Sequence, residues 1–131
     1  MMRKQTILLR IASIFSLFGV VFHLLFYRLF NWGEILNGLP TLDKAIFLTY
    51  HAICILTLLF MGVFPLLQTK DLLKSRLKYG ILSFFSLFYL IRIIAEFTLF
   101  SLTPSSPIIL LLCLIPMGGY SIPLFIKTKG Q

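Results

Sequence analysis

Four long runs of apolar residues, separated by short polar segments, divide the chain of 131 residues. The runs cover about residues 11–30, 45–67, 79–102 and 107–125, and none alternates between apolar and polar positions as a half-buried strand would. A helix needs roughly 20 mostly apolar residues to cross about 30 Å of hydrocarbon, because each residue rises about 1.5 Å. The pattern predicts an all-α fold: an integral membrane four-helix bundle with up-down-up-down topology, in a single transmembrane domain over residues 1–131.

Polar residues and prolines between the runs predict where the helices begin. Thr41 or Asp43 can cap the second helix by accepting a hydrogen bond from its first amides. Before the fourth run, Ser106 is predicted as an N-cap and Pro107 as the first helical residue. Because this link is short, we expect the third and fourth helices to be antiparallel neighbours.

The fourth run is the least regular, because Pro116, Gly118, Gly119 and Pro123 crowd its second half. Proline removes a backbone donor and clashes with the preceding turn, so a kink near Pro116 is predicted. One interpretation is a kink accommodated by packing. The alternative is an unwound segment that lines a cavity, as in transporters.

Composition and charge support the membrane interpretation. Hydrophobic residues make up 59% of the chain and charged residues 12%, a balance that a water-soluble domain of this size does not have. The net charge is +8, and the basic residues lie in short clusters between the apolar runs, which indicates positive-inside topology. Nine of them fall on one predicted side of the membrane: Arg3, Lys4, Arg10, Lys70, Lys74, Arg76, Lys78, Lys127 and Lys129. We therefore expect both termini in the cytoplasm and no nucleic-acid partner.

Two charged residues lie within the third run, where an ionisable group costs roughly 2.5 to 3.5 kcal/mol on insertion scales. Arg92 and Glu96 are four residues apart, so their side chains share a helix face and can meet. In one interpretation they neutralise each other and fasten the third helix to its neighbours. In the other, Arg92 binds an anionic headgroup or a carboxylate while Glu96 holds it in place.

Two histidines fall at a similar depth in the first and second runs, about two turns from the predicted outer ends. Tyrosines close to them in the sequence can supply hydroxyl partners. If these groups share a cavity, it should open toward the outer leaflet, with a headgroup by Arg92 and an apolar tail among Phe and Leu side chains. The candidate ligand-binding residues are His23, His51, Arg92, Glu96, Tyr27, Tyr50 and Tyr89.

The sequence contains little that indicates a cofactor site or an enzyme active site. His23 and His51 could ligate haem or a metal, but no third or fourth ligand follows with a recognised spacing. The two cysteines, Cys54 and Cys113, lie inside apolar runs and are interpreted as packing residues. No nucleophile with a base, phosphate-binding loop or metalloprotease motif is present. We predict no cofactor, no metal and no catalytic residue.

The segment FHLLFYRLFNW at 22–32, the leucine-spaced loop after it and the later Arg92-x-x-x-Glu96 together resemble small four-span bacterial membrane proteins that carry no assigned activity. The resemblance implies a bacterial inner-membrane location and no particular reaction.

Two hypotheses for function follow. The first is a non-enzymatic subunit or interaction protein of a membrane assembly, with a membrane-protein partner or as a homo-oligomer, because the loops are too short to form a domain. The second is a small bundle that binds a lipid, quinone or similar amphiphile at the polar cluster.

Overall fold

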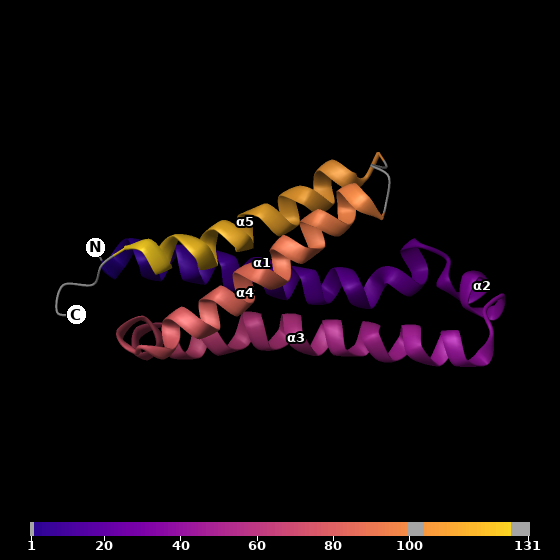
Figure 1. Cartoon of the computed structure of the whole chain (residues 1–131), viewed down its shortest axis with the longest axis horizontal. Coiled ribbons are helices and arrows are strands. Elements are labelled where there is room, and N and C mark those ends of the chain that lie inside the picture. The colour runs from indigo at the N-terminus through magenta and orange to yellow at the C-terminus, as the bar shows by residue number, and fades with distance from the viewer. Residues whose placement is uncertain (1, 100–103, 127–131) are drawn as a thin grey trace.

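The structure, a computed structural model, describes residues 2–99 and 104–126. Within these residues the chain forms five helices and no strand: α1 (Met2–Leu29), α2 (Trp32–Asn37), α3 (Thr41–Lys74), α4 (Leu77–Thr98) and α5 (Ser106–Phe125). The four long helices alternate in direction along the bundle (Figure 1). The predicted all-α, up-down-up-down four-helix bundle is confirmed.

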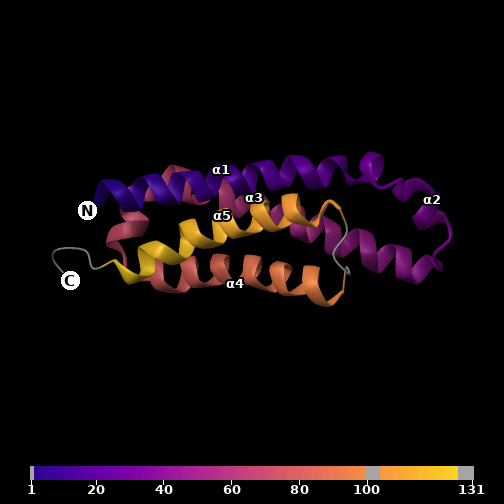
Figure 2. The ribbon, with the colours of Figure 1, turned by 90° about the horizontal axis from the view of Figure 1, so that it is seen from above.

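By length and composition, α1, α3, α4 and α5 can each cross a membrane. Between 17% and 28% of the most apolar stretch of each helix is buried inside the bundle, so most of its apolar surface faces outward. In water this surface would drive aggregation, whereas lipid tails can cover it. With 34 residues, α3 is about 50 Å long, and α1 and α3 extend past α4 and α5 where α2 lies (Figure 2).

The two ends of the bundle differ in charge. The α3–α4 turn, the start of α1 and the end of α5 lie at one end, here called the basic end; α2, the end of α4 and the start of α5 lie at the other, the α2 end (Figure 1). Exposed basic residues at the basic end include Arg3, Lys4, Lys70, Lys74 and Arg76. The described segments predicted to share one side of the membrane therefore do lie together; Lys127 and Lys129 lie outside the described residues.

Helix α1 packs against both α3 and α5, whereas α4 packs mainly on α5 and touches α3 little. Glycines allow the close approach to α1. A Cβ on Gly62 of α3 would lie 2.6 Å from the Leu17 side chain, and one on Gly119 of α5 would lie 2.6 Å from Cβ of Ala12. Small residues at contacts of this kind are the usual means by which membrane helices approach.

The starts of α3 and α5 differ from the predicted caps. Helix α3 begins at Thr41 with Pro40 at the N-cap, and no side chain caps it, so the capping role predicted for Thr41 or Asp43 is wrong. Ser106 is the first helical residue of α5, not its N-cap, and its hydroxyl donates to Glu96 instead. Pro107 is the second residue of α5 rather than the predicted first, and in this first turn its missing N–H costs nothing.

Of the two alternatives predicted for α5, the unwound segment does not form. Helix α5 continues through Pro116 and Pro123 as one helix from Ser106 to Phe125. The helical geometry is interrupted in α3 instead, at Gln68 (φ −111°, ψ 21°), three residues after Pro65. A proline ring clashes with the carbonyl four residues earlier, so the strain of Pro65 falls on the turn before it and does not account for the irregularity at Gln68.

Candidate functional site

A cavity of about 90 Å³ lies between α1, α3, α4 and α5, in the half of the bundle nearer α2. Three of the predicted site residues line it: His23 from α1, and Tyr89 and Arg92 from α4. Its walls are largely aromatic, with contributions from Phe15, Phe22, Phe26 and Phe88. A mostly apolar cavity with a few converging polar groups is the usual form of a small-molecule site.

His23 is the polar group in this cavity with an open hydrogen-bonding position. Its ring stacks on Phe26 at a centroid distance of 4.4 Å, and Nε2 lies 3.8 Å from Sγ of Cys54. The buried Nδ1 has no hydrogen-bond partner among the residues that the structure describes. An unsatisfied buried polar atom costs free energy, so a ligand atom that bonds to His23 would be favoured.

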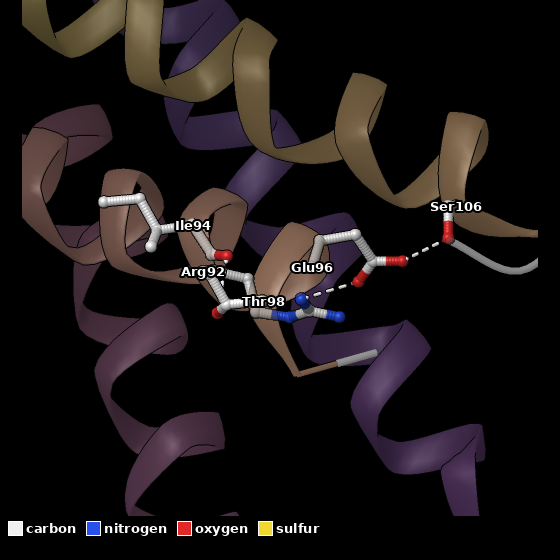
Figure 3. Close-up of polar contacts among 5 residues, drawn as sticks. All are labelled: Arg92, Ile94, Glu96, Thr98 and Ser106. Carbon is white, nitrogen blue, oxygen red and sulfur yellow. Dashed lines mark hydrogen bonds and ion pairs between the residues drawn. The ribbon is translucent and has the colours of Figure 1, made fainter. Parts of the chain in front are cut away.

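Arg92 is held by an ion pair within α4, and the carboxylate of that pair also accepts a hydrogen bond from α5 (Figure 3). Nη1 of Arg92 lies 2.7 Å from Oε2 of Glu96, and the hydroxyl of Ser106 donates to Oε1 of the same carboxylate at 2.5 Å. The predicted pairing of Arg92 and Glu96 is confirmed. Glu96 is 1% exposed and lies behind the arginine, whereas the Arg92 side chain is 31% exposed. The carboxylate therefore orients a guanidinium that borders the cavity.

His51 does not line this cavity, although its ring lies next to that of His23, at a centroid distance of 5.3 Å. Its Nε2 donates a hydrogen bond of 3.1 Å to the backbone carbonyl of His23. Its ring packs against Trp32 at a centroid distance of 4.7 Å and stacks near Phe26. These contacts join α3 to α1 and α2, and they give His51 a structural role.

The predicted tyrosines separate into two groups. Tyr89 lines the cavity, and its hydroxyl lies 2.7 Å from Oγ of Ser16. Tyr27 and Tyr50 are 54% and 69% exposed, on the outer surface of the bundle. The structure therefore brings together His23, Tyr89 and Arg92, with Glu96 behind, and does not bring His51, Tyr27 or Tyr50 into the same cavity.

A buried hydroxyl network that the sequence analysis missed joins all four long helices. Oγ of Ser16 on α1 contacts the hydroxyls of Tyr89 on α4, at 2.7 Å, and Tyr120 on α5, at 2.8 Å. Tyr120 donates to the backbone carbonyl of Met61 on α3 at 2.7 Å. Pro65 lies four residues after Met61, so this carbonyl has no intrahelical amide partner. Tyr120 supplies the missing donor.

Within the described part of the chain, no three His, Cys, Asp or Glu side chains group as a metal site requires. No protein-family model, curated protein or solved structure matches the chain. The resemblance to small four-span bacterial membrane proteins therefore stays a prediction.

Proposed function

We propose that this protein binds a membrane amphiphile without transforming it, in the cavity between α1, α3, α4 and α5. The proposal is supported by one observation above others: His23 and Arg92, from different helices, border the same aromatic-walled cavity. A volume of about 90 Å³ is below the roughly 300–1,000 Å³ of a complete small-molecule site. It can hold only part of a headgroup, so the rest of the ligand and its tail would lie in the surrounding lipid.

The charges favour an uncharged headgroup that carries acceptor oxygens. Arg92 is already neutralised by Glu96 at 2.7 Å, so a second anion would gain less there than beside an unpaired cation. His23 and Arg92 can both donate to a carbonyl oxygen. The neighbouring rings of Phe22, Phe26 and Phe88 can stack on a flat headgroup. A quinone has both properties, and its isoprenoid or alkyl tail would lie along α3 and α4, which diverge toward the α2 end (Figure 1).

We further propose that the protein lies in a bacterial inner membrane with the basic end in the cytoplasm. The exposed Lys and Arg residues gathered at that end support this orientation. The cavity then faces the outer half of the bilayer, where the headgroup of a membrane-dissolved ligand can enter from the side.

The single tryptophan provides the test. Trp32 packs at 5.4 Å from Phe26, a residue of the cavity wall, and quinones quench indole fluorescence at short range. Decylubiquinone titrated into the purified protein in lipid nanodiscs should quench Trp32 with a saturable curve. His23→Phe keeps a ring but removes the donor, and it should weaken binding up to about tenfold, the effect of roughly one hydrogen bond.

Tyr50→Phe is the control, since it removes a hydroxyl from the outer surface and should leave the curve unchanged. Quenching that does not saturate, or that is identical in His23→Phe and the unmodified protein, would contradict quinone binding in this cavity.

The second candidate is a subunit of a membrane assembly, or a homo-oligomer. It is favoured by the shortness of the segments between helices, such as the two residues between α3 and α4, which leave no soluble domain to act alone. Native mass spectrometry after extraction in mild detergent separates the two. A stoichiometric protein partner with no quinone binding would support this candidate and count against the first.

A further inference from the structure

A second, separate groove lies at the basic end, between α3 and α4. It has a volume of about 360 Å³ and shares no lining residue with the His23 cavity. Phe60 of α3 and a stretch of α4 form it; from α4 come Arg76, Leu77, Gly80, Ile81, Phe84 and Phe85. The groove is therefore apolar along its length, with a guanidinium at the end nearest the turn.

Gly80 leaves part of the groove open. A Cβ built on Gly80 would meet nothing within 4 Å, so α4 leaves open space at this position. Phe85 is 1% exposed and lies at the bottom of the groove, whereas Phe60 and Phe84 are 51% and 57% exposed. Since the exposed surface of these helices faces lipid, the groove opens to the side, into the bilayer.

The charges at the mouth of the groove identify what suits it. Arg76 is exposed where apolar α4 gives way to the turn, the level of lipid headgroups. Lys70 and Lys74 are exposed in the adjoining end of α3, with Asp71 between them. These three cations outweigh one carboxylate, and basic residues at this level attract anionic headgroups, each by roughly 1 kcal/mol.

We propose that this groove binds an anionic phospholipid, with an acyl chain along Gly80 and Ile81 and the phosphate at Arg76. The volume is near the lower limit of the roughly 300–1,000 Å³ found for small-molecule sites. That size suits one acyl chain, whereas a partner helix requires a broader contact surface. The site does not depend on ligand binding in the His23 cavity.

Native mass spectrometry tests the proposal on the full chain, taken from nanodiscs of equal phosphatidylglycerol and phosphatidylcholine. The unmodified protein should retain one phosphatidylglycerol in preference to phosphatidylcholine. Arg76→Gln should reduce this preference about fivefold, which corresponds to roughly 1 kcal/mol. Gly80→Leu should fill the groove and abolish retention of either lipid, while the unfolding midpoint stays at or above that of the unmodified protein.

Gly118→Leu is the matched control, because a Cβ at Gly118 also meets nothing within 4 Å but lies on α5; its lipid retention should be unchanged. Equal retention of both lipids by the unmodified protein, or a bound lipid that survives Gly80→Leu, would overturn the proposal. So would a co-purifying protein that Gly80→Leu displaces. Quenching of Trp32 by decylubiquinone should be the same in Gly80→Leu, so failure of this site and of the quinone site are distinguishable.

Discussion

Two adjacent glycines of α5 should respond in opposite directions to the same substitution. In Gly119→Ala, the new Cβ would lie 2.6 Å from Cβ of Ala12 and 2.9 Å from the backbone oxygen of Leu8. Neither atom can rotate away, because both are fixed by the backbone of α1, so α1 and α5 must separate. In Gly118→Ala the new Cβ meets nothing within 4 Å.

The two substitutions share one favourable effect, since alanine is preferred over glycine in a helix by up to about 1 kcal/mol. Only Gly119→Ala adds a steric cost, and overpacking of this kind typically costs about 1–3 kcal/mol. The difference in unfolding free energy between the two variants therefore isolates the steric cost. We expect Gly118→Ala to be neutral or more stable than the unmodified protein, and Gly119→Ala to be about 1–3 kcal/mol less stable than Gly118→Ala.

Reversible unfolding in mixed micelles of increasing sodium dodecyl sulfate, followed by far-ultraviolet circular dichroism, measures this difference. Adding Ala12→Gly to Gly119→Ala should restore part of the loss, because it removes the closer of the two contacts. Equal stability of Gly118→Ala and Gly119→Ala would refute the close packing of α1 and α5.

Three further predictions concern the buried polar groups and the orientation. Arg92→Leu and Glu96→Leu should each destabilise the protein more than the double variant, because the remaining charge loses its partner within the apolar part of α4; in the same unfolding assay, a double variant no more stable than either single one would contradict this. Tyr120→Phe leaves a buried carbonyl without its donor and should reduce the unfolding free energy by about 1–3 kcal/mol, with an unchanged value as the contrary result. In a background without the native cysteines, Ser105→Cys should react with an impermeant maleimide added to intact cells and Ser75→Cys should not; the reverse labelling would invert the proposed orientation.

Hydropathy predicted how many long helices the chain forms and that they alternate in direction. It could do so because a membrane span requires a long apolar run whatever its neighbours are. Hydropathy predicted the first and last residues of the helices less accurately. Helix α3 covers Thr41–Lys74, whereas its apolar run was placed at 45–67. The apolar run indicates only the part within hydrocarbon, and helical hydrogen bonding continues into the polar flanks.

The candidate site was predictable where it depended on spacing within one helix. Arg92 and Glu96 are four residues apart, and they pair as expected. Which side of a helix faces inward was not predictable, because runs that are apolar all round carry no amphipathic pattern. The sequence therefore showed that His23, His51 and Tyr50 lie at a similar depth. It could not show that, of the three, only His23 lines the cavity.

Contacts between residues on different helices also could not be predicted from the sequence. Ser106 suits an N-cap, yet its hydroxyl bonds to Glu96 on the neighbouring helix. Tyr120 donates to a carbonyl of Met61, 59 residues away. The local signal was the proline four residues after Met61, which leaves that carbonyl in need of a donor, but the sequence does not say which helix supplies one.

The packing of α1 against α3 and α5 has a consequence for biogenesis. Helices enter the membrane in chain order, so α1 and α3 can associate as soon as α3 is inserted. Helix α4 then has little surface on α3 to hold it, since its main contacts are with α5. Until α5 arrives, the surface of α1 around Ala12 and Ser16 stays open to lipid or to a chaperone. Helix α5 is thus the one that completes the bundle, and quality control that senses the unfinished protein would act on α1 and α4.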